Sequence, residues 1–290
     1  MMSVLAKRAT ATLAISASEY QKFCEYFYRR TGISFAENKR YFVDKRLIER
    51  IQKSGASGVE DYFERLRRHD ANGEIEILIN LLTINETYFY REDHQLDCLA
   101  NGILPELVSG RRKGDRVRIW SMPCSTGEEP YSIAMYLLEN WPQVDDYDIE
   151  IMASDIDTNV LRAAEGGVYD ARSLHRLTPE FVRKYFVSAG AEGFRLIDAI
   201  RQSVRFTKVN ASDLVEMRAF ANIDVIFCRN MLIYFDDRSR RQVVESFYDS
   251  LCQGGFICLG HSESMSRISS LFEVRKFPKA IVYQKRGGPR

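Results

Sequence analysis

The stretch Val117-Arg-Ile-Trp-Ser-Met-Pro-Cys-Ser-Thr-Gly-Glu-Glu-Pro130 decides the fold class of this chain. Its apolar start predicts a short buried strand, its middle predicts a turn at Gly127, and a helix is predicted from Glu128 to Trp141. Further strands are predicted at residues 148–154, 222–228 and 255–259, with a terminal antiparallel hairpin at residues 272–276 and 280–285. Strands that alternate with helices at this spacing predict an α/β fold with a doubly wound, mostly parallel sheet.

The part of the chain before this sheet is predicted to be helical. Apolar residues recur at helical spacing in four segments, near residues 20–32, 37–54, 59–69 and 74–82. We therefore expect a small all-helical N-terminal domain over residues 16–82. A linker over residues 83–92 and an α/β domain over residues 93–290 follow it.

One stretch interrupts the alternation of strands and helices. Thr178 and Pro179 are typical of the cap and first turn of a helix. Two strand-like runs follow, at residues 194–201 and 204–209, around a Gln-Ser turn. These signals predict a helix plus a hairpin inserted into the α/β domain at about residues 168–206.

The composition is that of a globular protein, with 45% hydrophobic and 28% charged residues. Because 41 basic residues face 40 acidic ones, no bulk field draws the chain to nucleic acid or to an anionic membrane. No apolar run approaches the ~18 residues of a membrane helix, so we expect no nucleic acid partner and no direct membrane insertion. Residues 1–18 are expected to form a loose tail rather than a signal peptide.

The six cysteines include no C-x-x-C pair, and most of them lie in apolar segments. This pattern favours reduced, buried thiols in a cytoplasmic protein over a disulfide framework. We expect no metal site.

Ligands of such sheets bind beyond the carboxyl ends of the strands, and the residues at these ends are informative. Gly127 allows a close approach of the backbone to a ligand. The G-x-G-x-x-G fingerprint is absent, and Glu128 and Glu129 would repel phosphate. A ligand with a cationic end is favoured over a dinucleotide.

The later strand ends add hydrogen-bonding side chains. Asp155 suits a ribose diol, although a helix cap is the alternative reading, and Asp157 or Thr158 could equally provide that cap. Asn210-Ala211 and Asn230-Met231 follow later strands, and an Asn amide suits an adenine edge. Together these features describe S-adenosylmethionine better than NAD.

Five segments of the sequence resemble motifs of the CheR-type chemotaxis receptor methyltransferases. They are Thr-x-Asn-x-Thr-x-Phe-x-Arg-Glu (83–92), Ser-Thr-Gly-Glu-Glu-Pro-Tyr-Ser (125–132), Ala-Ser-Asp-Ile-Asp (153–157), Ile-Phe-Cys-Arg-Asn-x-x-Ile-Tyr-Phe (226–235) and Gly-His-Ser-Glu (260–263). The resemblance covers about residues 16–285. It implies a Rossmann-like catalytic domain and methyl transfer from S-adenosylmethionine, with S-adenosylhomocysteine as product, to glutamate side chains of methyl-accepting chemotaxis receptors.

The resemblance also implies specific cofactor contacts, at Asn85, Thr87, Arg91, Glu129, Asp155, Asn210, Ala211, Asn230 and Met231. Gly127 joins this set from its place in the turn. Ala211 departs from the family, in which a larger apolar residue is usual. Arg91 and Tyr234 are the candidates for holding the acceptor carboxylate or the cofactor. Arg229 is a weaker candidate, since a buried ion pair explains it equally well.

The predicted helix at residues 37–54 carries a basic face of Lys39, Arg46, Arg50 and Lys53. The simpler alternative is that these four side chains are exposed to solvent and bind no partner. The local charge excess and the acidic helical receptor that the resemblance implies favour a docking surface. We expect a monomer.

Two rivals remain. A nucleic-acid methyltransferase would need an Asp/Asn-Pro-Pro-Tyr segment after the fourth strand, where this chain has Arg229-Asn-Met-Leu-Ile-Tyr234, and Cys124 lies in the cofactor loop rather than in a nucleophile position. A non-catalytic cofactor sensor is the other rival.

In the family the inserted hairpin of some members binds a receptor C-terminal peptide, and the short Gln202-Ser203 turn predicts that this chain does not depend on one.

Overall fold

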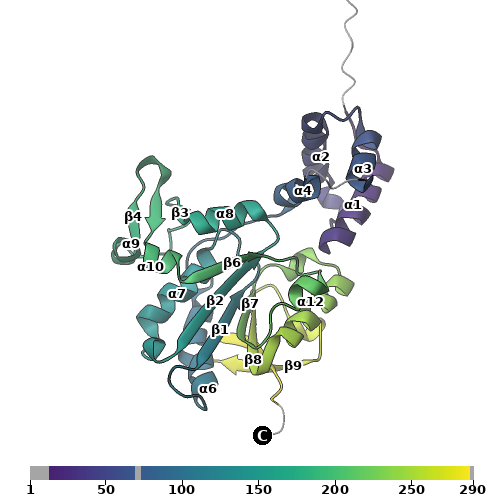
Figure 1. Cartoon of the computed structure of the whole chain (residues 1–290). Coiled ribbons are helices and arrows are strands. Elements are labelled where there is room, and N and C mark those ends of the chain that lie inside the picture. The colour runs from purple at the N-terminus through teal and green to yellow at the C-terminus, as the bar shows by residue number, and fades with distance from the viewer. Residues whose placement is uncertain (1–12, 69–72, 288–290) are drawn as a thin grey trace, which may run out of the picture. The chain divides into compact units, whose positions relative to one another are not determined.

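The central sheet has seven strands in the order β6-β2-β1-β7-β8-β10-β9 (Figure 1). Strands β6, β2, β1, β7 and β8 are parallel, and β10 is antiparallel to both β8 and β9. The strands are β1 (Arg116–Ser121), β2 (Asp148–Asp155), β6 (Val204–Lys208), β7 (Ile223–Cys228), β8 (Leu251–Leu259), β9 (Phe272–Phe277) and β10 (Ala280–Lys285). The doubly wound, mostly parallel sheet and its terminal hairpin are therefore confirmed.

This computed structural model describes residues 13–68 and 73–287. Most of the tail expected at residues 1–18 therefore lies outside the described residues. The chain divides into two compact units. One comprises Ser34–Leu82 and the residues up to Arg29, and the other comprises Arg30–Ile33 together with the chain from Thr83 onward. The ten residues expected as a linker thus belong to the second unit.

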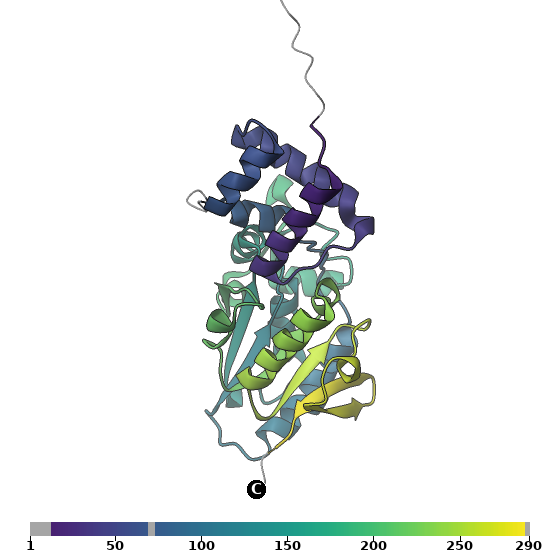
Figure 2. The same ribbon diagram turned by 90° about the vertical axis from the view of Figure 1, so that its right-hand side faces the viewer.

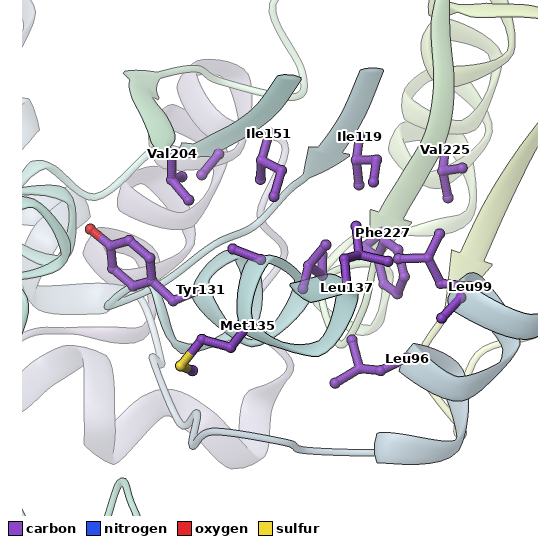
Figure 3. Packing of buried hydrophobic residues seen from close by; sticks show 14 of the residues in the cluster. Leu96, Leu99, Ile119, Tyr131, Met135, Leu137, Ile151, Val204, Val225 and Phe227 are labelled. Carbon is purple, nitrogen blue, oxygen red and sulfur yellow. The ribbon is translucent and has the colours of Figure 1, made fainter. Parts of the chain in front are cut away.

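Alternating side chains of the parallel strands build two cores, one on each face of the sheet. On one face, Ile119 of β1 and Ile151 of β2 pack against Tyr131 and Met135 of α7 (Glu128–Asn140) (Figure 3). The other helices of the second unit include α5 (Asp93–Cys98), α6 (Leu104–Val108) after the π-helical turn Leu99–Ile103, α8 (Thr158–Gly166) and α11 (Leu214–Met217).

On the other face, Trp120 of β1 is fully buried with Ile226 of β7 and Phe247 of α12 (Asp237–Ser250). Figure 2 shows α12 lying over this face of the sheet. Because successive side chains of a strand point to opposite faces, Ile119 and Trp120 serve different cores although they are neighbours in sequence.

The inserted hairpin was predicted from the wrong segments. A separate three-stranded sheet has the order β3-β5-β4 and contains β3 (Val168–Tyr169), β4 (Phe186–Ser188) and β5 (Phe194–Leu196). Its hairpin joins β4 to β5, and α9 (Pro179–Tyr185) precedes it with Thr178 as the expected cap. The run at residues 194–201 is instead a short strand followed by the helical turn α10 (Asp198–Arg201), and the run at residues 204–209 contains β6 of the main sheet.

The physical reason is a change of period within the first run. Leu196 and Ile200 are both buried while Asp198 between them is exposed, so the run does not keep the two-residue period of a strand. The true hairpin loop is Ala189–Gly193, where Gly193 has a φ of 106° and an added Cβ would lie 2.4 Å from the Tyr169 carbonyl oxygen. The short Gln202-Ser203 turn is not part of the hairpin. That turn therefore does not bear on peptide binding, and the expectation that this chain does not depend on a receptor peptide stays a prediction.

The four predicted N-terminal helices are present in the first unit. They are α1 (Ala17–Thr31), α2 (Arg40–Ser54), α3 (Val59–Arg68) and α4 (Glu74–Leu82), and the first turn of the second predicted helix is a 3-10 turn at Glu37–Lys39. Phe23, Val43, Leu47 and Leu78 are almost fully buried. These side chains hold the helices together, since they repeat along one stripe of each helix.

Candidate functional site

A pocket lies at the carboxyl ends of β1, β2 and β7, where the fold predicts ligand binding. Segment 84–91, the loop after β1 and the loop after β7 all contribute to its wall. Six of the residues expected to contact a cofactor line this pocket together, namely Asn85, Thr87, Arg91, Glu129, Asp155 and Asn230. Pro123, Cys124, Ser125 and Arg229 also line it.

Asp155 ends β2 and presents a buried carboxylate, 3% exposed, to this pocket. Its Oδ2 accepts a hydrogen bond from the Ser125 backbone N–H at 2.9 Å, and its Oδ1 accepts one from the Asp157 N–H at 3.0 Å. Burial raises the pKa of Asp155 to about 6. The carboxylate is therefore fixed in place by the backbone and remains ionised at neutral pH.

Asp157 resolves the alternative reading of Asp155 as a helix cap. The Asp157 side chain accepts hydrogen bonds from the Asn159 and Val160 N–H groups and so caps α8. Its other oxygen accepts from the Thr83 hydroxyl at 2.7 Å and from the Asn85 amide nitrogen at 2.8 Å. Asp157 therefore anchors segment 83–85 to the start of α8 and leaves Asp155 to face the pocket.

Arg229 links three parts of the site from a position that is 4% exposed. Its guanidinium donates to Glu129 Oε2 at 2.7 Å and to the Arg91 carbonyl oxygen at 2.7 Å, and it lies 3.4 Å from Glu92. The ion-pair reading of Arg229 is therefore confirmed. Burial raises the pKa of Glu129, while the Arg229 charge opposes that shift.

Gly127 and Glu128 serve the loop after β1 rather than this pocket. Gly127 has a φ of 93°, and an added Cβ would lie 2.9 Å from the Ala164 Cβ. Glu128 is 2% exposed and accepts hydrogen bonds from the hydroxyls of Thr126 and Ser173. Gly127 does not line the pocket, so the expected close approach to a ligand is replaced by close packing inside the protein.

Three of the expected cofactor contacts lie away from the pocket wall. The Asn210 amide nitrogen donates to the Arg30 carbonyl oxygen at 2.7 Å, and its Oδ1 accepts from the Ser212 N–H at 3.0 Å. Ala211 and Met231 are buried in the core beneath α12. The Asn210 amide thus joins segment Arg30–Ile33 to the loop after β6 within the second unit, and its expected contact with an adenine edge stays a prediction.

Arg91 and Tyr234, the two candidates for catalysis, differ in their placement. Arg91 lines the pocket, and its guanidinium donates to the Glu86 carbonyl oxygen at 2.6 Å. Tyr234 is half-buried and does not line the pocket, and burial raises the pKa of its hydroxyl. Arg91 is thus brought to the site, whereas Tyr234 is not part of its wall.

A residue that the sequence did not single out organises the loop after β7. Glu263 accepts hydrogen bonds from the backbone N–H groups of Gly260, Asn230 and Leu232, at 2.8–3.0 Å. Asn230 has a φ of 57°, a strained conformation that these contacts maintain. The Gly-His-Ser-Glu motif contained the signal, but its glutamate had no assigned role.

A second cavity of about 450 Å³ adjoins the first. The two share a wall, made by Asn85, Glu86, Thr87, Tyr88 and Arg91. The second cavity extends to Glu128 and to the loop at residues 170–175. Its size is typical of small-molecule and side-chain binding sites.

The Cys124 thiol is unsuited to act as a nucleophile. Cys124 is 1% exposed, and burial raises its pKa well above the ordinary value for a thiol. Among residues 13–68 and 73–287, no group of three or more His, Cys, Asp or Glu side chains is placed to hold a metal ion. None of the described helices is long and apolar enough to cross a membrane.

The basic face of α2 is smaller than the sequence predicted. Arg46 donates to the carbonyl oxygens of Leu81 and Phe42, and Arg50 forms a two-point ion pair with Glu74. The Arg50 and Glu74 side chains are only 15% and 18% exposed. Lys39 and Lys53 are exposed, but Lys53 Nζ forms an ion pair with Glu49 Oε1 at 2.6 Å, so among the described residues only Lys39 of the four has no such partner.

The residues that line the first pocket suit S-adenosylmethionine. The buried carboxylate of Asp155 can accept hydrogen bonds from both hydroxyls of a ribose. Glu129 offers a second carboxylate toward a cationic ligand. The loop after β1 carries two glutamates at the start of α7, where a dinucleotide site would bind pyrophosphate.

Comparison with known proteins agrees with this chemistry. Residues 18–83 match the all-alpha domain of CheR methyltransferases, and residues 85–281 match the S-adenosylmethionine-binding domain of CheR methyltransferases. The chain is 50% identical to Chemotaxis protein methyltransferase 2 of Vibrio cholerae over 94% of each chain. It is 34% identical to the Chemotaxis protein methyltransferase of Escherichia coli, over 92% of this chain and 91% of that protein.

Proposed function

The chain belongs to the CheR methyltransferase family, and from that premise we propose that it transfers methyl groups from S-adenosylmethionine to glutamate carboxylates of methyl-accepting chemotaxis receptors. The products are glutamate methyl esters, which adjust receptor signalling, and S-adenosylhomocysteine. The observation that carries the proposal is the pocket that joins Asp155, Glu129 and Arg91 beside a second cavity.

This reaction asks little acid–base chemistry of the protein. A glutamate acceptor is ionised at neutral pH, because a free glutamate titrates near ~4.3, so no side chain has to remove a proton. When bound, S-adenosylmethionine supplies a methyl group on a sulfonium that is already activated for transfer. The work left to the chain is to hold the acceptor carboxylate in line and to keep water away.

Each residue of the first pocket has a role in this scheme. Asp155 would accept the ribose hydroxyls, and Glu129, held by Arg229, would face the amino-acid end of the cofactor. Asn85, Thr87 and Asn230 would complete the wall of that site. Arg91 lies in the wall between the two cavities, and its position supports a role in holding the acceptor carboxylate.

Arg91 would act mainly on binding. Because the negative acceptor and the positive sulfonium neutralise each other in the transition state, a fixed cation stabilises the ground state at least as strongly. Tyr234 is a second candidate for holding the acceptor. Its hydroxyl lies close enough to Arg91 and Glu86, which line both cavities, for both charges to act on its pKa.

We propose that the helical unit docks the acidic receptor through α2 and that the enzyme works in the cytoplasm as a monomer. The exposed cations Lys39 and Lys53 support the docking role. Nucleic acid is not a proposed partner, because the formal charge of the chain is only +1.

The test is methyl transfer with purified components. The full chain is incubated with labelled S-adenosylmethionine and with the cytoplasmic fragment of a chemoreceptor, and receptor-bound label is counted. The proposal expects label on the receptor with the wild-type chain and little with Asp155→Ala. Cofactor binding without transfer would contradict it and would favour a cofactor-sensing scaffold.

A further inference from the structure

The second cavity contains an arginine that no part of the site described above uses. Arg172 lies in the loop between β3 and α9 and lines this cavity. Its side chain is exposed, and it makes no hydrogen bond or ion pair with any residue that the structure describes. Most other arginines of the catalytic unit are paired, including Arg111 with Asp224 and Arg118 with Glu150.

Carboxylates also line the cavity, but most of them are already engaged. Glu92 accepts from His261 and lies 3.4 Å from Arg229. Glu128 is buried and accepts from two hydroxyls, and Asp170 accepts the Ser173 N–H at 2.9 Å. Glu86 is exposed and forms no ion pair with Arg91 or Arg172 among the described residues. Within residues 13–68 and 73–287, the guanidinium groups of both arginines therefore lack a carboxylate partner.

The loop that carries Arg172 is held by several contacts against segment 83–92, which contributes to both cavities. His175 Nδ1 donates to the Arg172 carbonyl oxygen at 2.7 Å, since a carbonyl can only accept. The His175 ring packs on Tyr88 with 4.7 Å between ring centroids, and the Phe89 N–H donates to the Ser173 carbonyl oxygen at 3.0 Å. Tyr88 in turn lies beneath the Arg91 guanidinium, 5.9 Å away.

These contacts place two guanidinium groups without a carboxylate partner in one cavity, Arg91 at the wall shared with the first pocket and Arg172 on the loop at residues 170–175. A receptor glutamate held at Arg91 would bring its neighbours on the same helix into this cavity. A guanidinium binds a carboxylate through two parallel hydrogen bonds, which gives geometric selectivity as well as affinity.

We propose that Arg172 binds a second acidic side chain of the receptor, one that lies within a helical turn or two of the glutamate that accepts the methyl group. This proposal rests on the proposed function. Arg172 is then a specificity determinant, because a neighbour that has been amidated or esterified has lost the charge it recognises. His175 is a positioning residue that fixes the backbone of Arg172.

The test compares Arg172→Ala with Arg176→Ala in the full chain. Arg176 is exposed on the same loop, does not line the cavity, and lies 3.9 Å from Asp93, so it is a matched control. The substrates are the receptor cytoplasmic fragment and a panel in which each acidic residue within two helical turns of a methylated glutamate is replaced by Gln.

The proposal expects Arg172→Ala to raise the receptor KM several-fold with little change in kcat and with unchanged S-adenosylhomocysteine affinity. One receptor Glu→Gln substitution should raise the KM of the wild-type enzyme and of Arg176→Ala, yet have no further effect on Arg172→Ala. Equal sensitivity of all three enzymes to every receptor substitution would overturn the proposal. Failure of the wild-type enzyme to methylate any receptor would instead overturn the proposed function.

Discussion

Glu263 and Asn230, 33 residues apart in the chain, are joined by a hydrogen bond from the Asn230 backbone N–H to the Glu263 carboxylate at 2.9 Å. The same carboxylate accepts from the Leu232 and Gly260 N–H groups. An added Cβ on Gly260 would lie 3.0 Å from the Asn230 nitrogen, so the two loops also pack closely. The end of β8 thus sets the shape of the loop that follows β7.

Removal of this carboxylate should loosen the cofactor site. Glu263→Ala leaves three backbone N–H groups without their partner, and each loss costs about 1–3 kcal/mol if the group stays buried. We expect S-adenosylhomocysteine affinity to fall at least about tenfold, which corresponds to about 1.4 kcal/mol. Glu263→Gln keeps one side-chain oxygen as acceptor, so its S-adenosylhomocysteine affinity should lie between those of the wild-type chain and of Glu263→Ala.

Calorimetry measures these affinities, and Glu273→Ala provides the control, since Glu273 is a half-exposed carboxylate on β9. If Glu263→Ala binds S-adenosylhomocysteine as tightly as the control variant does, Glu263 does not organise the site.

The second prediction concerns Asp155 itself. Hydrogen bonds from ribose hydroxyls to a carboxylate are worth roughly 1.5–3 kcal/mol, so Asp155→Ala should weaken S-adenosylmethionine and S-adenosylhomocysteine at least about tenfold. Its folded state should persist, because the Asp157 cap of α8 is untouched. Unchanged affinity would remove Asp155 from the site, and tighter binding of NAD than of either ligand would reject the cofactor assignment.

Cofactor binding should also depend on pH through Asp155. The pKa of this carboxyl is raised from 3.8 to about 6 by burial, so its ionised form is lost as the pH falls through about 6. Because the ribose hydroxyls donate to the ionised form, affinity should decline over that window and level off above it. Asp155→Asn should remove the inflection, and a flat profile for the wild-type chain would contradict the assignment.

The same shift has a consequence for the stability of the free protein. Between pH 4 and 6 the folded chain holds a proton on Asp155 that the unfolded chain has released. The contribution of this group to the free energy of unfolding therefore decreases as the pH rises through this window. Cofactor affinity and intrinsic stability should thus respond to pH in opposite directions.

The docking surface is best tested at two exposed lysines, Lys39 immediately before α2 and Lys53 in its last turn. Reversal of Lys39 and Lys53 to Glu should raise the receptor KM several-fold at low salt and flatten its salt dependence, while cofactor affinity stays unchanged. Reversal of the exposed Arg67 and Arg68 to Glu, the same charge change on α3, is the control. An unchanged KM at low salt would show that this face of α2 is merely solvated.

Arg46 and Arg50 are unsuitable for that test. Arg50 and the Tyr62 hydroxyl both bind the Glu74 carboxylate, so a substitution of Arg50 disturbs a partly buried network of the helical unit. A loss of receptor methylation in such a variant would report instability as readily as lost docking.

Regular periodicity allowed most of the fold to be predicted. The strands at residues 116–121 and 148–155 have strong apolar patterns bounded by turn residues, and these consecutive strands are neighbours in the sheet. The prediction of the inserted hairpin was wrong because two short apolar runs with a plausible turn between them give the same sequence pattern whether they pair with each other or with distant strands. Only tertiary pairing of β6 with β2 decides that case.

Side-chain roles were harder to predict than strand positions. The carboxylate of Asp155 was found because a strand end restricts where it can point. Asn210, Arg46 and Arg50 have side chains that can reach several partners, and the partners they contact lie 24 to 180 residues away. Glu263 was overlooked because its partners are backbone N–H groups, which leave no mark in the sequence.

The most direct test of the central claim is the chemical identity of the methylated group. The receptor fragment is incubated with the enzyme and S-adenosylmethionine, digested, and analysed by mass spectrometry before and after mild alkaline treatment. The account predicts peptides heavier by one methyl group on glutamate, with the increase lost in alkali as expected for an ester. Methyl groups that survive alkali, or that appear on any other side chain, would contradict it.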